Sequence, residues 1–218
     1  MEIKGETRPL VIQRSNARLS YRFFKRLADI VLSGIGLILL SWLFLFLALC
    51  IKLHDGGPVF YSQTRVGKGQ KKFRMWKFRS MVTNADKLKE KLMAQNEIEG
   101  AMFKLQNDPR VTKIGKFIRK YSLDELPQLW NVLIGDMSLV GPRPPLPNEV
   151  EQYTERDLLR LMVKPGCTGL WQVTSRSSAS FSEMVNLDLI YIERRSLRYD
   201  FILILKTIKI MIVPNETA

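Results

Sequence analysis

The hydrophobic pattern is dominated by one long apolar run near the start of the chain. Residues 30–51, IVLSGIGLILLSWLFLFLALCI, contain no charged side chain over 22 positions. About 20 apolar residues are enough to cross the hydrocarbon core of a bilayer, and a helix that is apolar all round has few places to be buried in a small protein. We therefore expect residues 21–53 to form a membrane-inserted helix rather than a buried core helix.

After this run the pattern predicts a small cytosolic domain over residues 54–196. A turn at Gly56-Gly57-Pro58 separates the two parts. Two strands are expected, at 59–61 and 72–79, because the second alternates apolar and basic residues, with a turn at 66–69 between them. Helices are expected at 86–99, at 113–134 with an interruption near Ser122, at 149–163 and at 181–195. The predicted fold class is α+β and mainly helical, with a proline-rich extended stretch at 142–147.

A second apolar stretch ends the patterned part of the chain. Residues 197–213, LRYDFILILKTIKIMIV, place basic side chains among apolar ones. This segment reads either as a core helix packed on the domain or as an amphipathic helix in the headgroup layer, with its basic side chains reaching lipid phosphates. Residues 1–20 are polar and are expected to form a mobile tail, and residues 214–218 a short one.

The net positive charge of the chain favours anionic binding partners but does not identify one. The 218 residues hold 34 Lys and Arg against 21 Asp and Glu, a formal net charge of +13. Such a balance favours phosphate-bearing substrates, anionic lipid or nucleic acid. One histidine, His54, and two cysteines without a CxxC pair exclude a multi-histidine metal site, a zinc finger and a disulfide framework. The low cysteine count suits a reducing, cytosolic compartment.

Positive charge lies on both sides of the apolar run. Residues 1–26 carry seven Lys and Arg against two Glu, and residues 52–79 carry eight against one Asp. Because positive residues near a membrane segment prefer the cytoplasm, a straight spanning helix would send one cluster outside. A re-entrant helix that returns to the same face satisfies both clusters. No proline breaks the run, however, so the residues alone leave both topologies open.

The chemistry is concentrated around one acidic pair. Ser122 and Glu125 in Ser122-Leu123-Asp124-Glu125 have the spacing of a helix capping box, which is the plain structural interpretation. The pair Asp124-Glu125 also lies among basic residues, with Arg119 before it and Arg143 after it. Adjacent carboxylates among cations are suited to hold Mg²⁺ and a diphosphate together, and an aspartate is able to attack phosphorus as a nucleophile. The sequence therefore points to phosphoryl chemistry here, with Asp124 and Glu125 as metal ligands.

Further cations are placed where they could complete this site. Proline on both sides of Arg143 fixes its backbone and presents one guanidinium rigidly. Lys77 and Arg79 lie two residues apart on the predicted strand and so share a face, either as a solvated surface or as phosphate ligands. We predict Lys77, Arg79, Arg119 and Arg143 as phosphate- or substrate-binding residues.

Several ordered blocks resemble the bacterial sugar transferase family of small monotopic phosphoglycosyl transferases. They are FKRLADIVLSGIGLILLS, GGPVFYSQTRVGKGQKKFRMWKFRSM, NDPRVTKIGKFIRKYSLDELPQLWNVLIGDMSLVGPRP, KPGCTGLWQVTSR and YIERRSLRYDFILILKTI. Together they cover about residues 21–213. The resemblance implies transfer of a sugar-1-phosphate from a UDP-sugar to undecaprenyl phosphate with release of UMP, as the first membrane step of exopolysaccharide, capsule or O-antigen synthesis.

The resemblance also implies roles for single residues. The family's acidic dyad falls on Asp124, the proposed nucleophile that forms a covalent phosphosugar intermediate, and on Glu125, which is linked to Mg²⁺. Lys77, Arg119 and Arg143 match family phosphate-site positions. Arg176, in the KPGCTGLWQVTSR block, is expected to meet the nucleotide or the sugar. That block resembles those of hexose-1-phosphate transferases, so glucose or galactose is the expected sugar.

The family fold implies a re-entrant helix, interfacial amphipathic helices and a catalytic domain on the cytoplasmic face of the inner membrane. One departure is that Ser41-Trp42 stands where family members often break the helix at Ser-Pro. Anionic lipid is an expected partner and nucleic acid is not, although Phe73, Trp76 and Phe78 are the nearest to base-stacking aromatics. A non-catalytic lipid-binding scaffold is the other alternative. A homodimer is compatible with a chain of this size, but no interface is evident.

Overall fold

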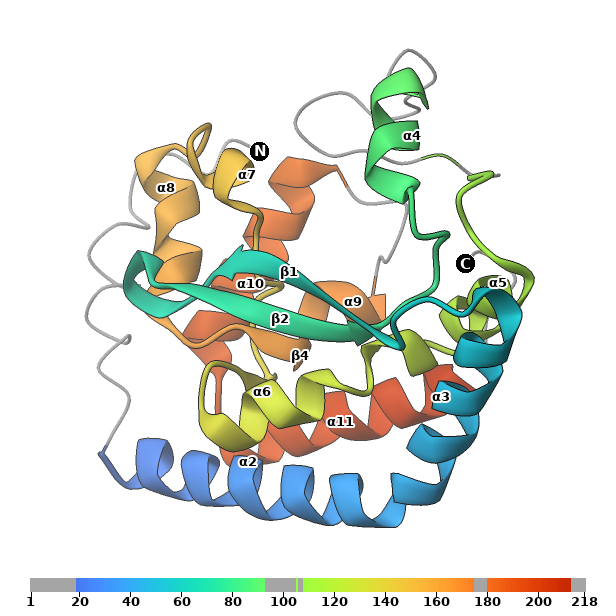
Figure 1. Cartoon of the computed structure of the whole chain (residues 1–218). Coiled ribbons are helices and arrows are strands. Elements are labelled where there is room, and N and C mark those ends of the chain that lie inside the picture. Colours follow the sequence, from blue (N-terminus) through green and yellow to red (C-terminus); the bar gives the residue numbers. More distant parts are fainter. Residues whose placement is uncertain (1–18, 93–104, 106–107, 175–179, 213–218) are drawn as a thin grey trace.

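The structure is a computed structural model that describes residues 19–92, 105, 108–174 and 180–212 (Figure 1). It is a mixed fold of helices and strands in which helices predominate. The expected tail over residues 1–20 falls almost wholly outside the described residues, as does the second half of the helix expected at 86–99. The described part of that helix is α4 (Ala85–Leu92).

The apolar run forms a bent pair of helices, α2 (Leu19–Leu39) and α3 (Ser41–Asp55), which meet at an angle of 59°. The bend lies at Leu40, directly before Ser41, and it forms without proline. Neighbouring segments hold the two helices apart, since α2 contacts α6 and β3 whereas α3 contacts α5. Among the described residues, no single helix is long and apolar enough to cross a bilayer, and only by combined length and composition does this bent pair reach that threshold.

Two small sheets organise the domain. Strands β1 (Phe60–Val66) and β2 (Lys72–Phe78) form an antiparallel hairpin, with Tyr61 opposite Lys77 and Arg65 opposite Phe73. The turn between them includes a 3-10 helix, η1 (Lys68–Gln70). Strands β3 (Ser138–Val140) and β4 (Gly166–Thr168) pair in parallel. The predicted hairpin is confirmed, and its first strand is longer than expected.

Helices account for most of the remaining described chain. The segment expected at 113–134 is α5 (Lys113–Lys120), the 3-10 helix η3 (Leu123–Glu125) and α6 (Gln128–Ile134), so the interruption near Ser122 is confirmed. The last two helices of the domain are α10 (Phe181–Arg194) and α11 (Leu197–Ile212), close to their predicted bounds. A short helix, α9 (Leu170–Thr174), lies between β4 and α10.

One predicted helix is wrong. Instead of a helix over 149–163, the chain forms α7 (Pro147–Val150), α8 (Glu155–Leu158) and the 3-10 helix η4 (Leu159–Met162). The break has a local cause, because Thr154 starts a new helix by accepting a hydrogen bond from the backbone of Asp157, whose carboxylate accepts one from the backbone of Thr154. A capping box inside an apolar pattern therefore divides the segment.

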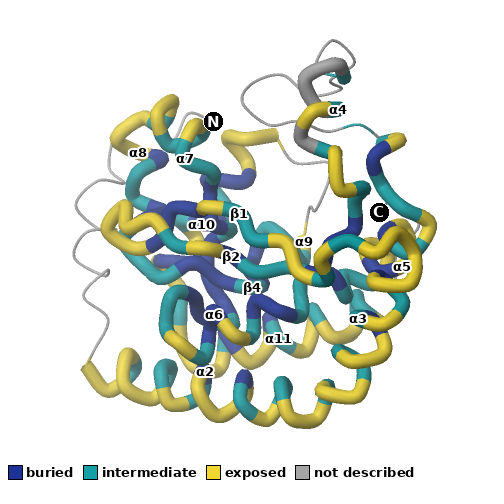
Figure 2. Tube along the Cα trace, in the orientation of Figure 1, coloured by how far each residue is buried: buried dark blue, intermediate teal, exposed yellow. Residues whose placement is uncertain are grey.

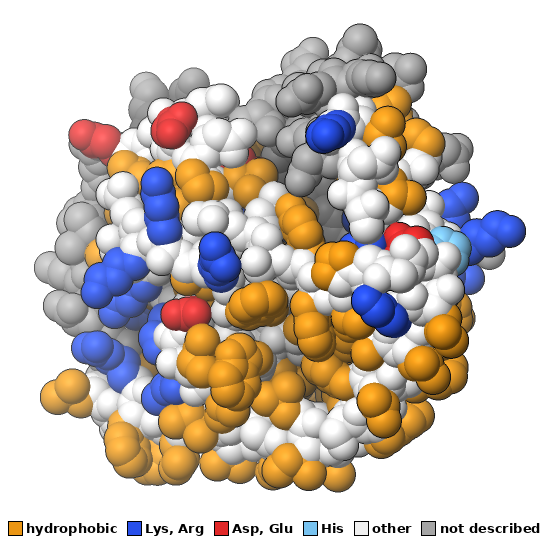
Figure 3. All heavy atoms as spheres, in the orientation of Figure 1, with side chains coloured by type: hydrophobic (Ala, Val, Ile, Leu, Met, Phe, Trp, Pro, Cys, Tyr) orange, Lys and Arg blue, Asp and Glu red, His pale blue; other side chains and the backbone are white. Residues whose placement is uncertain are grey.

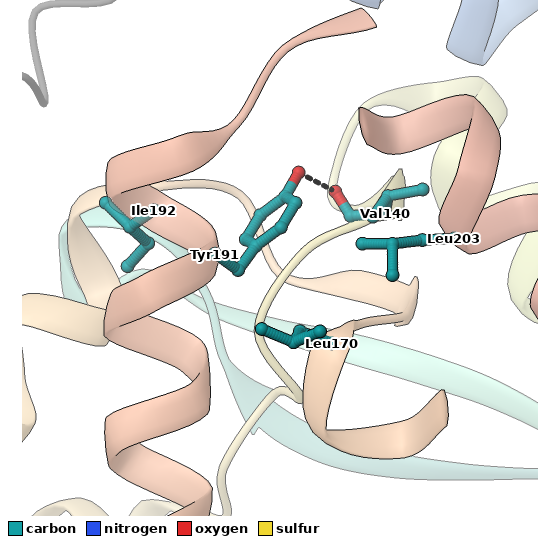
Figure 4. Close-up of a cluster of buried hydrophobic side chains, with 5 residues drawn as sticks. All are labelled: Val140, Leu170, Tyr191, Ile192 and Leu203. Carbon is teal, nitrogen blue, oxygen red and sulfur yellow. Dashed lines mark hydrogen bonds between the residues drawn. The ribbon is translucent and has the colours of Figure 1, made fainter. Parts of the chain in front are cut away.

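The core consists of three clusters. The largest joins β3, α9, α10 and α11 through Val140, Leu170, Tyr191, Ile192 and Leu203, and the Tyr191 hydroxyl donates to the Val140 carbonyl over 3.0 Å (Figure 4). A second cluster joins α3 to β2 and α5, and a third joins β2 to α6. Helix α11 thus contributes Leu203 to the core, while other apolar side chains of the same helix lie on the surface.

The polarity of α2 is inverted relative to a surface helix of a soluble protein. Its buried residues are polar, Asp29 at 4% exposure and Ser33 at 0%, whereas its large apolar side chains face outward. The surface apolar residues of α2 and α3 include Phe23, Phe24, Leu45, Phe46 and Leu53. Figure 2 shows α2 as largely exposed, and Figure 3 shows apolar side chains gathered along that edge of the molecule. A contiguous apolar surface of this kind marks a lipid or protein contact.

Candidate active site

The acidic pair lies on a strained turn rather than in a capped helix. Ser122 has φ 55° and ψ 23°, the left-handed region that non-glycine residues seldom adopt, and its side chain makes no capping hydrogen bond to η3. The carboxylate of Glu125 turns away from Ser122 and binds Lys77 instead. The capping-box interpretation of Ser122 and Glu125 is therefore wrong, and the strain at Ser122 is of the kind found at functional sites.

Leucines on either side of the pair fix this turn against α3. Leu123 and Leu126 pack on the cluster of Leu47, Ile51, Phe78 and Ile118. The intervening residues, Asp124 and Glu125, are left to face the domain interior beside β2. Because Leu47 and Ile51 belong to α3, the turn that carries the acidic pair and the second helix of the bent pair share one apolar cluster.

The two carboxyl groups differ in their electrostatic surroundings. Lys77 Nζ lies 2.5 Å from Glu125 Oε1. Burial alone would raise the pKa of Glu125, but Lys77, helped by Arg143 and Arg65, lowers it below its usual range. Burial raises the pKa of Asp124 to about 6, and Glu125 adds to this rise while Lys77 and Arg119 oppose it. The pair thus separates into one firmly ionised carboxylate and one poised near neutral pH.

Arg79 contacts the end of α3 and not the acidic pair. Its guanidinium pairs with Asp55 at the end of α3 and packs against Gly57, where an added Cβ would clash with it. Arg79 is 8% exposed, and its Nε and Nη1 atoms have no partner among the described residues. Arg79 therefore joins α3 to the end of β2, and the structure does not bring it to the acidic pair.

Of the other predicted cations, Arg119 and Lys77 lie at the site. Arg119 donates from Nε to Ser80 Oγ over 2.8 Å and acts electrostatically on Asp124. Lys77 is in direct contact with Glu125, as described above. Arg176 lies outside the described residues.

The Pro-Arg-Pro segment is held by its carbonyl groups. Residues 142–145 each offer a carbonyl that accepts one hydrogen bond from a different part of the chain. The donors, in order, are Gly166 N at 2.9 Å, Arg160 Nη2 at 3.3 Å, Arg65 Nη1 at 3.0 Å and Val66 N at 3.0 Å. Proline lacks an N–H group, so these carbonyls carry the backbone hydrogen bonding of the segment.

This frame fixes the direction of Arg143. Arg160, one of the donors, is itself buried and paired with buried Asp188 over 2.7 Å. The guanidinium of Arg143 stacks over the ring of Trp171 at 5.6 Å from its centroid. The prediction that prolines present Arg143 rigidly is supported by this geometry, although the buried arginine behind it has no simple sequence signal.

A small hollow gathers several of these groups, although neither Asp124 nor Arg119 is part of its lining. It is lined by Arg65, Lys77, Glu125, Arg143, Gln128 and Gln172, with Met75, Pro144 and Gly166 completing its wall. Arg65, Gln128 and Gln172 were not predicted as site residues. The alternation of β1 places Arg65 on the same face as Tyr61, whose cross-strand neighbour is Lys77, and this was the one signal available.

The acidic pair fits a magnesium ion only in part by itself. Among the described residues there is no group of three or more His, Cys, Asp or Glu that would enclose a metal. Magnesium commonly binds through one or two carboxylates together with substrate phosphates and water. Asp124 and Glu125 supply two carboxylates, and the contact with Lys77 occupies one oxygen of Glu125. The donor set therefore fits Mg²⁺ in the presence of a phosphate ligand.

Together these features form a cluster of carboxylates and cations close to an apolar surface. The profile of the family described as bacterial sugar transferase matches residues 20–214, and the chain belongs to this family. It is 48% identical over 197 residues to the galactosyl transferase CpsE of Streptococcus agalactiae serotype III, covering 90% of this chain and 44% of that protein. It is 46% identical over 207 residues to the undecaprenyl-phosphate galactose phosphotransferase of Salmonella typhimurium, covering 93% and 43%.

A relative of similar length is the exopolysaccharide production protein ExoY of Rhizobium meliloti, 42% identical over 188 residues that cover 84% of this chain and 83% of that protein. The chain spans less than half the length of the two longer relatives. The family resemblance stated from the sequence blocks is thus confirmed.

Proposed function

We propose that this chain is a phosphoglycosyl transferase that moves a sugar-1-phosphate from a UDP-sugar to undecaprenyl phosphate and releases UMP. The observation that carries the proposal is the buried carboxyl of Asp124, poised near neutral pH beside an ion-paired Glu125 at a hollow lined by cations. The names of relatives, among them an undecaprenyl-phosphate galactose phosphotransferase and a UDP-glucose:undecaprenyl-phosphate glucose-1-phosphate transferase, support the substrates.

Asp124 is the nucleophile in this proposal. Its carboxylate oxygen bonds to the sugar-bearing phosphorus of the UDP-sugar, and the bond from that phosphorus to the UMP oxygen breaks. The bond electrons leave with UMP, and an aspartyl-phosphosugar remains. A phosphate oxygen of undecaprenyl phosphate then attacks the same phosphorus and frees the Asp124 carboxylate. The donor and the acceptor use one phosphate site in turn.

The basic residues stabilise the charge that builds on the transferred group. Arg143, held rigidly by its carbonyl frame, and Lys77 line the hollow, and Arg119 acts on Asp124. Fixed cations in a partly buried site need no rearrangement during the reaction, which makes them effective there. Asp124 and Glu125 are the residues that would hold Mg²⁺. The ion would supply charge neutralisation for the diphosphate.

The same proposal places the chain at the cytoplasmic face of the inner membrane. The inverted polarity of α2, the outward apolar side chains of α3 and the exposed Phe201, Ile202 and Leu205 of α11 support insertion of these surfaces into lipid. Undecaprenyl phosphate stays in the bilayer, and a UDP-sugar stays in water. A dyad packed against α3 meets both at their boundary. We propose α2 and α3 as the re-entrant pair, and exopolysaccharide or capsule synthesis as the pathway.

The test is UMP release by the detergent-solubilised chain from a panel of UDP-sugars, with and without undecaprenyl phosphate and Mg²⁺. We expect continued UMP release over many turnovers only with metal and lipid present, and most UMP from UDP-galactose or UDP-glucose. With the acceptor withheld, a single turnover should leave a phosphosugar on Asp124, detected by intact mass and absent in Asp124→Asn. Folded protein that forms no UMP with any sugar would contradict the proposed reaction, and the scaffold alternative would then be preferred.

A further inference from the structure

The hollow contains two buried side chains to which the proposed reaction has given no role. They are Arg65, 7% exposed on β1, and Gln128, 3% exposed at the start of α6. Both line the hollow together with Lys77 and Arg143. Burying polar groups is costly unless they are paired, so each needs a reason to be there.

Arg65 has hydrogen bonds but makes no ion pair with the described residues, although Glu149 and Glu125 act on it electrostatically. Its Nη1 donates to the Pro144 carbonyl over 3.0 Å, and its Nη2 donates to Gln63 Oε1 over 2.7 Å. Its Nε is buried without a partner, and within the described part of the chain no carboxylate lies within ion-pair distance. Burial, and the like charge of Arg143, lower the pKa of Arg65 to about 10. A buried guanidinium without an acidic partner is an unfavourable arrangement for the free protein.

Gln128 also lacks a partner for its side chain. Its amide makes no hydrogen bond to any residue that the structure describes, and although the residue is 3% exposed, the amide atoms are not fully closed off from the hollow. It follows Asp124 by four residues and lies beside Glu125 in the lining of the hollow. An amide group in this position offers two N–H donors to whatever enters.

The charges in the lining identify the class of ligand. Arg65, Lys77 and Arg143 contribute three positive charges and Glu125 contributes one negative charge, a balance of 3 − 1 = +2. The indole Nε1 of Trp171, which stacks under Arg143, is a further buried donor without a partner among the described residues. A ligand rich in acceptors and carrying two negative charges complements this lining, and a phosphate monoester dianion has both properties.

We propose that Arg65 and Gln128 are substrate-binding residues that hold a phosphate monoester in this hollow, Arg65 by neutralising its second charge and Gln128 by donating to a phosphate oxygen. This inference rests on the proposed function, in which the lipid acceptor and the released UMP are both phosphate monoesters. In this arrangement the Arg65 side chain would contact both the ligand and the Pro144 carbonyl, and so would connect the ligand to the segment that carries Arg143.

The test compares a dianion with a monoanion of similar size. The detergent-solubilised chain is titrated calorimetrically with methyl phosphate and with dimethyl phosphate at pH 8. We expect Arg65→Gln to weaken the binding of methyl phosphate about tenfold, or about 1.4 kcal/mol, and the binding of dimethyl phosphate much less, because only the dianion carries the second charge. Arg74→Gln is the matched control, since Arg74 is exposed on the opposite face of the same hairpin, and it should change neither. Gln128→Leu should weaken the binding of both methyl phosphate and dimethyl phosphate. Gln152→Leu, at an exposed position, should weaken the binding of neither.

The outcomes separate binding from a structural role. A loss in Arg65→Gln that is equal for both probes would mean that Arg65 only positions Pro144, and unchanged affinities would remove the assignment altogether. If Arg65→Gln does not fold, Arg65→Lys decides. It keeps the charge and should keep the preference for methyl phosphate, and loss of that preference would overturn the inference.

Two further titrations identify the source of the phosphate. Farnesyl phosphate, a short polyprenyl phosphate, and UMP are compared in the parent chain and in Arg65→Gln. If Arg65→Gln weakens the binding of farnesyl phosphate alone, the site belongs to the lipid acceptor. If it weakens the binding of UMP alone, the site belongs to the nucleotide. If it weakens the binding of neither, the inference is overturned. Failure of the proposed function is a different result, because methyl phosphate would still bind through Arg65 in a chain that forms no UMP.

Discussion

Replacing Asp124 by asparagine should abolish turnover and at the same time stabilise the protein. Asparagine keeps the shape of the side chain but removes the charge and the nucleophile. Burial raises the pKa of Asp124 from 3.8 to about 6. Above pH 6 the carboxyl is ionised in both folded and unfolded chains, and the folded state carries a penalty of about 3 kcal/mol, from roughly 1.4 kcal/mol for each pKa unit.

The pH dependence of the stability gain tests whether the buried, ionised carboxyl of Asp124 is its cause. The penalty fades as the pH falls through about 6, where the folded carboxyl takes up its proton, and is gone below 3.8, where both states are protonated. Asp124→Asn should therefore unfold at a higher denaturant concentration than the parent chain at pH 8, and the difference should shrink toward pH 4. Glu151→Gln, at an exposed position, is the control and should change little. An asparagine variant that turns over UDP-sugar, or a stability gain that does not vary with pH, would refute the reasoning.

Three other perturbations follow from the contacts of the site. Glu125→Gln removes the partner of Lys77, so UMP release should fall by about two orders of magnitude, roughly the loss of one partly buried charged contact, and the Mg²⁺ concentration for half-maximal rate should rise. An unchanged metal dependence would count against Glu125 as a ligand. Ser122→Gly should relieve the left-handed backbone and stabilise the fold by about 1 kcal/mol in a denaturant titration without loss of turnover, whereas a destabilised variant would show that the Ser122 side chain has a contact of its own. Arg79→Gln and Asp55→Asn should each lower the melting temperature, and the double variant should be little worse than either, since both break one contact; additive losses would mean that the two side chains act separately.

Local pattern was sufficient for most of the secondary structure. The alternation of apolar and basic residues in β2, and the interruption of the helical pattern near Ser122, were both visible in the sequence. The helix predicted over 149–163 failed because an apolar pattern extends through Thr154, where a capping box starts a new helix. Periodicity records which residues are buried, whereas a cap decides where a helix begins.

The site was predictable where the chain brings its members together locally. Asp124 and Glu125 are neighbours, and Arg143 is presented by adjacent prolines. Arg79 shows the limit of this reasoning, since its spacing from Lys77 predicted a shared role but its guanidinium turns to Asp55. Arg65 and Gln128 reach the hollow only through the pairing of β1 with β2 and the packing of α6, and neither contact is encoded in a short motif.

The inward polar side chains of α2 provide a physical link between the proposed lipid surface and the hollow. Asp29 accepts hydrogen bonds from Ser138 Oγ at 3.0 Å and from the backbone of Leu139 at 2.9 Å, both in β3. Arg26 donates to the carbonyls of Val132 and Leu133 in α6. Strand β3 leads directly into the segment that carries Arg143, and α6 begins at Gln128. Because buried polar contacts of this kind are costly to break, α2 cannot shift in the bilayer without moving both walls of the hollow. In the proposed membrane-inserted arrangement, the depth of α2 in lipid would set the height of the proposed phosphate site above it.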